Sequence, residues 1–491
     1  MKEATFETPK ASQDEGSETE ELEKEWQSLD WRSIEKQVSR MQTRISKAAS
    51  KHDTNDMLRL SYLLTHSFYA KALAVKLVCS NKGSHTSGID NVFWTTDAQK
   101  MQAVKELDPN HYHAKPLRRV GIPKKNGKVR YLGIPTMHDR AMQTLYWLAL
   151  DPICEATSDP NSYGFRKGRC CQDAIEKLFL DMAPQRAPKL VLEGDIKGCF
   201  DHISHSWLME NIPMERRILH EFLKAGYIWK GGLFPTEEGT PQGGSISPTL
   251  ANMALNGMEP LVKEHFPKGV TLTRYADDFI VVVPDEETAE TVEELLVEFL
   301  KERGLELSLE KTLITDIDDG FDFLGFNLRK YNGKMIIKPS KKAFENIKEN
   351  LREVVLGRGK AKPQAKVICE LNPKIAGWCN YYNKVCSKKT FSALHDYLFT
   401  ILKQWAHRRH SRKDPHWVLA KYWHKVGDNE YVFSDGDFIL KSPKSVAIRR
   451  HFKVRGTANP YIDRDYFERR SKPGHTTRKA CPKATALNKS G

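Results

Sequence analysis

Two adjacent aspartates, Asp277 and Asp278, stand between strongly apolar, β-branched runs in the segment TLTRYADDFIVVVP. Neighbouring carboxylates repel each other, and each is costly to bury without a partner. The pattern therefore predicts two short strands, residues 272–275 and 279–283, joined by a tight connection that carries the acids. An Asp-Asp pair alone is more often a plain surface turn, but the apolar runs on both sides argue against that reading.

A third aspartate, Asp195, follows another apolar run, residues 189–193, which also predicts a buried strand. Carboxylates at strand ends and hairpin tips can converge on one point while the scaffold stays rigid. Hard divalent cations prefer such oxygen ligands. Two of these ions about 4 Å apart assist in-line displacement at phosphorus. The three aspartates therefore indicate nucleotidyl transfer.

Length and composition narrow the remaining choices. The 491 residues predict two to four domains, and no apolar run approaches the roughly 20 residues that span a bilayer, so we expect no membrane partner. Residues 1–25 hold three Lys and nine Asp or Glu, a composition that predicts a disordered tail rather than a secretory signal. The nine cysteines include no CxxC pair, which argues against structural zinc and favours a reducing cytoplasm.

The net charge of +14 is concentrated toward the end of the chain. Residues 401–491 hold 21 Lys or Arg and eight Asp or Glu, a local charge of +13. Aromatic residues such as Trp405, Trp417 and Tyr431 are interleaved with these cations. A solvated basic surface is the simpler explanation, but cations mixed with aromatics suit phosphate contact and base stacking together. We therefore expect a nucleic-acid partner.

Two cations flank a predicted hairpin turn at Asn126-Gly127, in RRVGIPKKNGKVRYLGIP. Lys124 and Arg130 lie on either side of this turn, so both can reach one triphosphate, although isolated cations are more often surface charges. Helices are expected mainly over residues 26–74, 139–157, 172–182 and 285–302, and over most of 340–422.

Three further segments add weaker signals. NSYGFRKGRC at 161–170 is Gly-rich and basic, and suits backbone contact with a nucleotide or template. GTPQGGSISP at 239–248 supplies a Gly-rich turn before a helix, where a base can approach closely. FDFLGFNLRK, from residue 321, is expected to form a strand containing a glycine, and a core role alone would also explain it.

The order of these segments resembles the motif order of reverse transcriptases, and most specifically the bacterial group II intron-encoded proteins. The succession is the Lys124–Arg130 hairpin, DIKGCFD, TPQGG, YADD, LSLEKT and FLGF. Further along, LNPKIAGWCNYYNKVCSKKTFSALHDYL resembles the maturase or X domain, and SPKSVAIRRHFKVRGTANPYIDRDYFERR resembles the DNA-binding segment of that family. The resemblance covers residues 26–470, most of the chain.

This resemblance implies an α+β fold with a right-hand polymerase made of fingers, a palm with an antiparallel sheet, and a helical thumb. The expected domains are a disordered acidic tail (1–25), an N-terminal helical extension (26–95), fingers and palm (96–335), thumb or maturase domain (336–425), a basic DNA-binding segment (426–475) and a flexible basic tail (476–491).

The resemblance also implies roles for individual residues. Asp195, Asp277, Asp278 and the backbone oxygen of Ile196 would coordinate two Mg²⁺, with Mn²⁺ as an alternative. The dNTP would be held by Lys124, Arg130 and Gln242, with Phe200 stacking under the sugar and excluding a 2′-hydroxyl. Lys311 is a candidate general acid for pyrophosphate departure. Primer or template contacts are expected at Arg166, Gly243, Tyr275, Phe323 and Gly325, and a nucleic-acid-binding basic patch at Lys388, Lys389, Arg408, Arg409, Arg412, Arg449 and Arg450.

The function implied is an RNA-directed DNA polymerase of a mobile group II intron that also binds its intron RNA to promote splicing. Target DNA and dNTPs are the other expected partners, in the bacterial cytoplasm and at the nucleoid, and the sequence leaves open whether the protein is a monomer or a dimer. Many relatives carry a C-terminal His-Asn-His endonuclease, which is not expected here, so primers would come from nascent strands at replication forks. A domesticated reverse transcriptase in DNA repair or phage defence, or a splicing factor with little polymerase activity, remain alternatives.

Overall fold

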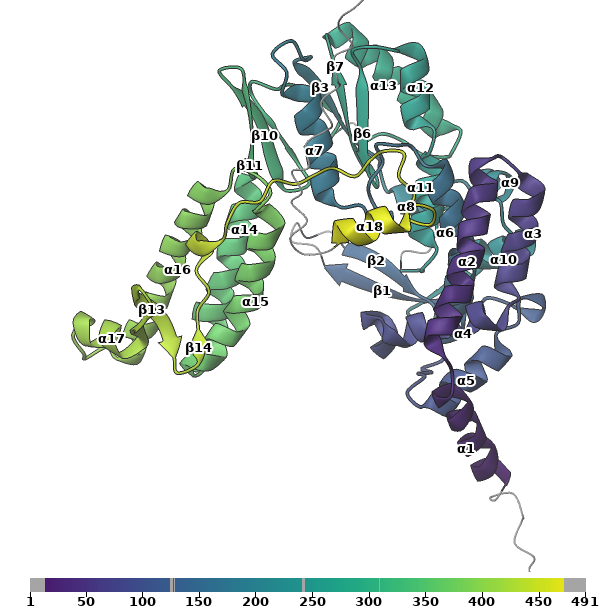
Figure 1. Ribbon diagram of the computed structural model, residues 1–491, viewed down its shortest axis with the longest axis horizontal. Coiled ribbons are helices and arrows are strands. Elements are labelled where there is room, and N and C mark those ends of the chain that lie inside the picture. Colours follow the sequence, from purple (N-terminus) through teal and green to yellow (C-terminus); the bar gives the residue numbers. More distant parts are fainter. Residues whose placement is uncertain (1–13, 124–126, 128, 241–242, 309, 472–491) are drawn as a thin grey trace, which may run out of the picture.

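A four-stranded antiparallel sheet, with strand order β6-β7-β3-β8, forms the centre of the palm. The computed structural model describes residues 14–123, 127, 129–240, 243–308 and 310–471. Mixed helices and mainly antiparallel sheets confirm the predicted α+β class (Figure 1). The palm strands are β3 (Leu190–Asp195), β6 (Thr271–Tyr275), β7 (Asp278–Val283) and β8 (Leu313–Asp316).

The palm sheet separates two hydrophobic cores because its strands alternate apolar side chains between both faces. Val191 and Ile280 pack on one face, with helix α7 (Cys171–Met182) and thumb residues. Leu192 and Val281 pack on the other, with α13 (Glu286–Lys301) and the N-terminal helices. Both faces are covered, so the strands read as continuous apolar runs, as the sequence suggested.

The N-terminal region is a helical layer that continues into the fingers. Helix α2 has buried residues at Ile34, Val38 and Ile45, the spacing that predicted a helix. The tail expected to be disordered over 1–25 is instead helical from Asp14, because Trp26 is buried and Glu25 forms an ion pair with Lys105 at 2.8 Å. The helices are α1 (Asp14–Gln27), α2 (Trp31–Ser50), α3 (Thr54–Thr65), α4 (Phe68–Ser80), α5 (Asp97–Glu106) and α6 (Met137–Thr157).

The fingers sheet has the order β2-β1-β4-β5, and its β1–β2 hairpin is the one predicted around Asn126-Gly127. Arg130 pairs with Ile122 across this hairpin. Short helices connect the fingers to the palm. The strands are β1 (Leu117–Pro123), β2 (Val129–Ile134), β4 (Tyr227–Trp229) and β5 (Gly232–Phe234), and the helices are α8 (Cys199–His202), α9 (His205–Asn211), α10 (Arg216–Lys224), α11 (Ser247–Leu255) and α12 (Met258–His265).

The segment expected to be one strand from residue 321 is a hairpin that joins palm and thumb. Leu324 and Gly325, with φ of +50° and +80°, form the turn between β9 (Phe321–Phe323) and β10 (Phe326–Tyr331). Two consecutive left-handed residues match the twist of paired strands, which the apolar pattern alone did not reveal. Strand β11 (Lys334–Pro339) completes this sheet.

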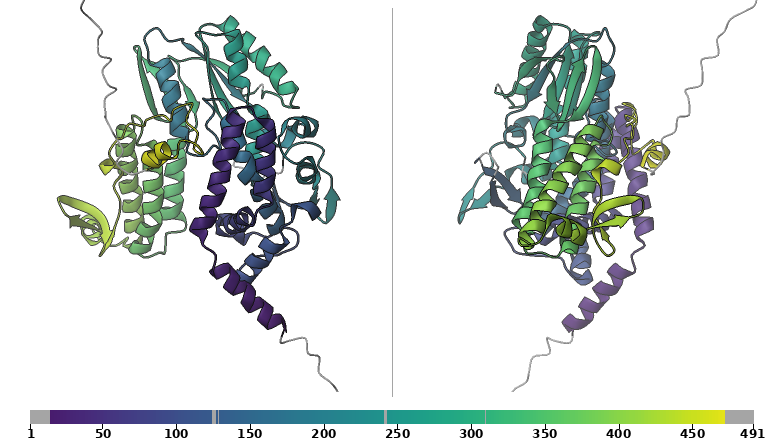
Figure 2. Two further views of the ribbon diagram at one scale, coloured as in Figure 1. Left: turned by 45° about the vertical axis from the view of Figure 1, so that its right-hand side comes forward. Right: turned by 90° about the vertical axis from the view of Figure 1, so that its left-hand side faces the viewer.

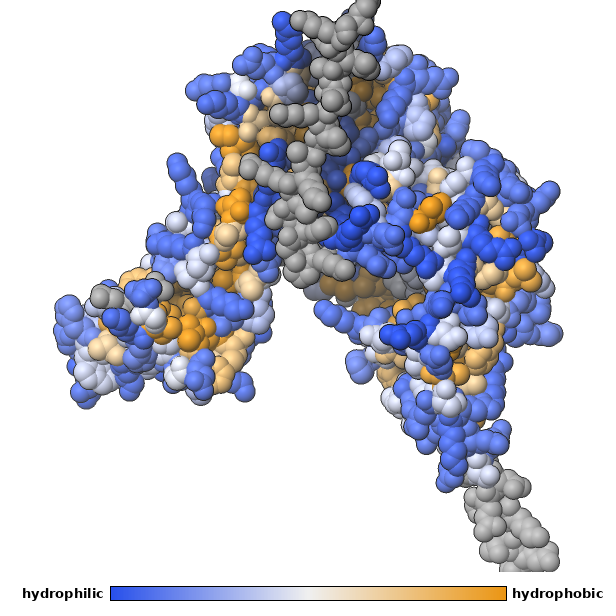
Figure 3. All heavy atoms as spheres, viewed as in Figure 1, coloured by the Kyte–Doolittle hydropathy of each residue, from blue (hydrophilic) through white to orange (hydrophobic). Residues whose placement is uncertain are grey.

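Helices packed side by side form the thumb, at the side of the molecule away from the N-terminal helices (Figure 2). They are α14 (Lys341–Arg352), α15 (Gln364–Tyr382), α16 (Lys388–Arg409) and α17 (Pro415–Tyr422). A small sheet of β12 (Trp423–Val426), β13 (Asn429–Asp435) and β14 (Phe438–Ile439) attaches to them, since Gln364 donates to the carbonyls of Tyr422 and Ser434. The expected domain boundary at 425/426 therefore lies inside β12. Apolar side chains gather at this free end of the thumb (Figure 3).

Residues 441–471, which we call the C-terminal arm, cross from the thumb over the palm to the N-terminal helices and end in α18 (Arg464–Ser471) (Figure 1). The backbone N–H of Arg449 donates to Asn383 of the thumb at 2.8 Å. At the other end, Asn459 donates to Ser46 of α2 at 2.9 Å. The arm thus connects the thumb to the N-terminal helices. Within the described residues, no helix is long and apolar enough to cross a bilayer.

Candidate active site

The palm strands place the three aspartates at one end of the sheet. Asp195, the last residue of β3, is the direct cross-strand partner of Asp278, the first residue of β7. Asp278 is also paired with Tyr275 of β6, which leaves Ala276 and Asp277 as a two-residue turn. Directly opposed residues of an antiparallel pair lie about 5 Å apart. The sheet register therefore brings together carboxylates that are far apart in the sequence.

A close contact between Gly194 and Phe279 maintains this register. The two residues are cross-strand partners, and a Cβ added at Gly194 would lie 2.1 Å from Cζ of the Phe279 ring. The ring therefore lies flat across the glycine, one position before the Asp195–Asp278 pair. A side chain at position 194 would push β3 and β7 apart where the carboxylates must meet.

Crowding of the carboxylates changes their titration. Burial, and then the charge of Asp195, raise the pKa of Asp277 above its usual value. The pKa of Asp278 rises to about 7, because the surrounding protein displaces water from it and because Asp277 and Asp195 carry like charges. Asp278 keeps an exposed surface, so this is crowding at the floor of an open site rather than full burial. Clustered acids of this kind are suited to a divalent cation.

Lys311 lies directly beside this cluster. Its ammonium donates to Oδ2 of Asp195 at 2.6 Å, and this bond raises the pKa of the lysine. The loop that carries Lys311 is held to the end of β3, since the N–H of Ser308 donates to the carbonyl of Asp195 at 2.8 Å. Ile196 and Leu307 form an isolated antiparallel β-bridge between the same two segments. The general acid expected from the sequence therefore has a defined place next to the carboxylates.

A fully buried arginine supports the turn formed by Ala276 and Asp277. Arg274 donates to the carbonyl of Ala276 at 3.0 Å, and to the side-chain oxygens of Asn252 at 3.2 Å and Asn256 at 3.3 Å. Asn252 also donates to the carbonyl of Gly164 at 2.9 Å. These bonds hold Ala276, which has a φ of +59°, in the left-handed conformation that the turn needs.

An open cavity of about 710 Å³ lies over the carboxylates. Arg130, Phe200 and Lys311 line it together with Asp195 and Asp277. The predicted contacts Lys124 and Gln242 lie outside the described residues. Arg119 also lines the cavity, between the rings of Tyr131 and Tyr227, at 4.5 and 4.1 Å from their centroids, and the sequence reasoning did not single it out.

Phe165 is a second cavity residue that the sequence reasoning missed. Its ring is 54% exposed, and it meets the ring of Phe200 edge to face, with centroids 6.0 Å apart. Its φ of +57° is a strained conformation for an aromatic residue. Residues on both sides are anchored: a Cβ on Gly164 would lie 2.3 Å from the backbone nitrogen of Ala276, and Arg166 is buried. Strain of this kind is typical of functional sites.

The residues predicted to contact primer or template differ in burial and in their partners. Arg166 donates both to Glu155, at 2.9 Å, and to backbone carbonyls, so its buried guanidinium is occupied inside the protein. Phe323 is 5% exposed and belongs to the core beneath the hairpin. Tyr275 is half-buried, and Gly325 accepts a hydrogen bond from Tyr382 at 3.1 Å. Gly243, at φ +117°, lies close to the carbonyl of Gly133.

The residues of the predicted basic patch are divided between the thumb and the C-terminal arm. Arg409 donates to the carbonyls of Lys360 and Lys362, and Lys388 donates to that of Lys444. These cations therefore brace the thumb and the arm. Lys389, Arg408 and Arg412 are exposed on the thumb, whereas Arg449 and Arg450 belong to the C-terminal arm and line a separate cavity.

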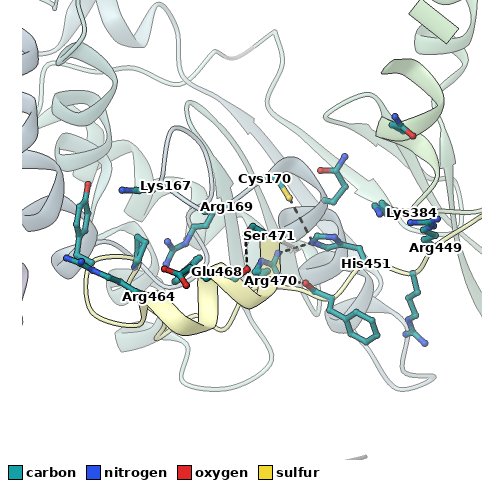
Figure 4. Close-up of a pocket in the computed structure, with 18 of the residues that line it drawn as sticks. Lys167, Arg169, Cys170, Lys384, Arg449, His451, Arg464, Glu468, Arg470 and Ser471 are labelled. Atoms are coloured by element: carbon teal, nitrogen blue, oxygen red, sulfur yellow. Dashed lines mark hydrogen bonds between the residues drawn. The ribbon is translucent and has the colours of Figure 1, made fainter. Parts of the chain in front are cut away.

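Cys170, Asp173 and His451 form a cluster that resembles a metal site. The His451 ring lies 2.9 Å from Oδ1 of Asp173, and the N–H of Val454 donates to the same oxygen at 2.8 Å. Arg470 also bonds Asp173 and lies 3.3 Å from the His451 nitrogen. A guanidinium in this position opposes a metal cation. The cluster is therefore an ionic anchor between the arm and α7. Figure 4 shows His451 and Arg470 of the arm together with Cys170.

Comparison with known families divides the chain in the same way as the fold. Residues 26–107 match the N-terminal domain of reverse transcriptase. Residues 122–328 match the reverse transcriptase (RNA-dependent DNA polymerase) family, which includes all three aspartates. Residues 344–423 match the maturase-specific domain of group II introns, on the thumb helices.

The chain is also similar to individual proteins. The chain is 34% identical to Protein YkfC of Escherichia coli, over 59% of this chain and 88% of that protein. It is 28% identical to the group II intron-encoded protein LtrA of Lactococcus lactis, over 69% of this chain and 72% of that protein. Among solved structures, a telomerase from Candida albicans matches with a TM-score of 0.37 and 14% identity, over 64% of this chain and 65% of that one.

Proposed function

Because the chain belongs to the group II intron-encoded reverse transcriptases with a maturase domain, we propose that Asp195, Asp277 and Asp278 hold two Mg²⁺ ions and that the cavity above them receives a dNTP. The protein is an RNA-directed DNA polymerase and maturase, and RNA is its partner. The observation that supports the residue roles most directly is the Asp195–Asp278 register beside the Asp277 turn.

The carboxylates fit the metal in charge and in chemistry. Three aspartates at one strand end supply hard oxygen ligands, and their mutual repulsion is relieved by divalent cations. When bound, the ions would activate the primer 3′-oxygen and stabilise the leaving pyrophosphate. The protein itself contributes positioning: the hairpin, Gly194 and Arg274 hold the ligands, and Arg130 supplies charge for the triphosphate.

Primer extension on an RNA template tests this function directly. With purified protein, Mg²⁺ and dNTPs, we expect a labelled DNA primer to be extended to the end of the template. A splicing factor without polymerase activity would leave the primer unextended. Replacing Mg²⁺ by Ca²⁺, which prefers longer bonds and more ligands, should stop extension without releasing the nucleic acid.

Lys311→Ala is expected to lower the rate of nucleotide addition by roughly 10²-fold, because general acid catalysis typically contributes that much. The loss of a cation beside Asp195 should also strengthen Mg²⁺ binding, so the Mg²⁺ concentration at half-maximal activity should fall or stay constant. Single-turnover kinetics over an Mg²⁺ titration measures both quantities. A rise in the Mg²⁺ requirement, with no change in the maximal rate, would contradict this role.

Phe200→Ala is expected to relax sugar discrimination. The half-buried ring lies in the cavity beside the carboxylates, where it can exclude a 2′-hydroxyl sterically. We expect the ratio of kcat/KM for dNTP over rNTP to fall by roughly 10- to 100-fold, on the order of one well-placed steric contact. Conservative Phe200→Tyr should keep the ratio. An unchanged preference in the alanine variant would rule out the assignment.

Phe165→Gly separates stability from function. Glycine tolerates the φ of +57°, so removing the exposed, strained ring should stabilise the protein by roughly 1 kcal/mol. The same change removes the partner of Phe200, so KM for dNTP should rise several-fold with little change in kcat. Thermal unfolding and steady-state kinetics give the two readouts. A less stable variant with normal KM would show that Phe165 is only a packing residue.

Intron RNA has a suitable surface on α2, away from the catalytic cavity. Exposed cations recur along this helix with mostly four-residue spacing, which places them along one side over about 28 Å. Across the described residues, none of them has an ion-pair partner. Such a row can follow a phosphate backbone, with strong salt dependence. The residues are Arg32, Lys36, Arg40, Arg44, Lys47 and Lys51.

A further inference from the structure

The largest cavity among those described lies beneath the C-terminal arm and not over the aspartates. It measures about 1180 Å³ and is lined by the 167–172 segment, the end of thumb helix α15, and the arm (Figure 4). Seven Lys or Arg side chains line it, against one carboxylate, that of Glu468. We call it the basic cavity. Its charge is far from balanced, which indicates an anionic ligand.

Backbone contacts force two of these cations together. The N–H of Arg449 donates to the carbonyl of Asn383 at 2.8 Å, which places Arg449 beside Lys384, and Figure 4 shows the two side chains at one end of the cavity. Neither side chain has a carboxylate partner among the residues that the structure describes. Like charges held side by side repel each other, and a phosphate between them would relieve this repulsion.

The opposite end of the cavity carries a third available cation. Lys167 is exposed, and its ammonium lies 4.9 Å from the centroid of the Tyr461 ring. It forms no ion pair among the residues that the structure describes. Arg169 and Arg470 are different, because they already bond the buried acids Glu155 and Asp173. Cations are therefore available at both ends of an elongated site. A single small anion could not contact both ends at once.

Two features favour a nucleic-acid strand over a compact anion. Phe452 lines the basic cavity with its ring 51% exposed, so bases could stack on it between phosphate contacts. Lys167 is also only two residues from Phe165, so their Cα atoms lie at most about 7 Å apart. Phe165 lines the catalytic cavity. The two cavities thus share the 165–167 segment as a wall.

We propose that the basic cavity binds a single-stranded segment of the nucleic acid being copied, with its phosphates at Lys167, Lys384 and Arg449 and a base against Phe452. This site is separate from the carboxylate site. The proposal rests on the proposed function only in taking the bound strand to be the one that is copied or extended. The arm is then part of the substrate track and not only a structural connection.

The test compares the variant Lys167→Ala, Lys384→Ala, Arg449→Ala with a matched control that removes three exposed cations outside the cavity lining, Lys189→Ala, Lys268→Ala, Lys334→Ala. Fluorescence anisotropy with labelled single-stranded RNA and DNA oligonucleotides, without Mg²⁺ or dNTPs, gives the dissociation constant over a salt series. We expect the cavity variant to bind about tenfold more weakly. Its log K against log[salt] slope should be shallower by about 2, since each single-strand phosphate contact contributes about 0.7.

Other outcomes would overturn the proposal. Equal affinities and slopes for the cavity and control variants would show that no strand binds there. If the cavity variant lost affinity only for a blunt RNA–DNA duplex, the cavity would be a duplex site. If it lost only the stabilisation that inorganic phosphate gives to the parent protein, the cavity would be a site for a small anion. Asp277→Asn should keep full oligonucleotide binding while it loses synthesis, so failure of the catalytic assignment remains distinguishable. Photocrosslinking from position 452 to a labelled template or a labelled primer then identifies the strand.

Discussion

Replacing Asp277 or Asp278 with asparagine is expected to abolish DNA synthesis while leaving the fold and RNA binding intact. Each change removes a negatively charged oxygen from the proposed metal site. Metal stabilisation of the transition state is worth several kcal/mol, which corresponds to roughly a 10⁴-fold loss of rate. The surface proposed for RNA lies on α2, away from these carboxylates, so intron splicing should continue. Primer extension and a splicing assay on the same preparations measure both activities.

Stability gives an independent readout for the Asp278→Asn variant. The folded pKa of Asp278 is about 7, above its unfolded value of 3.8, so ionisation of this group destabilises the fold as pH rises from about 4 to 7. The neutral asparagine avoids this cost. In EDTA at pH 8, we expect the variant to have a slightly higher Tm than the parent protein. The gain in the free energy of unfolding should be roughly 1 kcal/mol or less, because the group is exposed. A markedly lower Tm would mean that the side chain is structural.

Asp173→Ala is expected to be the most destabilising of the substitutions considered, because it removes the anchor of the C-terminal arm. Asp173 is fully buried and bonds His451, Arg470 and the N–H of Val454. Removing one partner from a buried ionic cluster costs about 3 kcal/mol or more. Differential scanning calorimetry should show a Tm lower by several degrees. Limited proteolysis should cut within residues 441–471 much faster than in the parent protein.

A nearby acid provides the control for Asp173. Glu176 lies one turn further along α7, and its ion pair with the exposed Arg450 is long, at 3.9 Å. Glu176→Gln should change stability by less than about 0.5 kcal/mol. If both variants lost stability equally, the anchor would be a general property of α7 and not of Asp173.

The pH dependence of the same anchor follows from its titration. His451 and Arg470 lower the pKa of Asp173 from 3.8 to about 2, against the opposing effect of burial. The folded state therefore favours the ionised form, and the stabilisation is fully present above pH 4 and lost as pH falls toward 2. The shift corresponds to roughly 2 kcal/mol. In the alanine variant this acid-dependent loss should disappear.

The sequence predicted the elements of the palm well because local signals and tertiary packing agree there. The β-branched runs on both sides of Asp277 could only become strands buried on two faces, and the sheet then sets the pairing with Asp195. The β1–β2 hairpin and the Asp285 cap of α13 are similarly local. These features depend on neighbouring residues, which sequence reasoning can evaluate.

Other features depended on contacts between distant segments. Arg166 is in a basic, Gly-rich stretch typical of substrate contact, but Glu155 on α6 neutralises it inside the protein. Phe165 gave no sequence signal, because its exposure and left-handed backbone arise only when Gly164 packs on the catalytic turn. The basic cavity is likewise assembled from distant segments of the chain. The sequence shows that these segments are basic, but it does not show that they come together in the fold.

The path of the C-terminal arm also has a consequence for synthesis on the ribosome. The arm bonds Ser46 of α2, Asp173 of α7 and Asn383 of the thumb, so helices made early remain without these partners until translation has passed residue 471. A nascent chain would therefore present an incomplete hand, with its polar anchoring groups open to water. Newly made intron RNA can meet the finished protein only after that last stretch has emerged and docked.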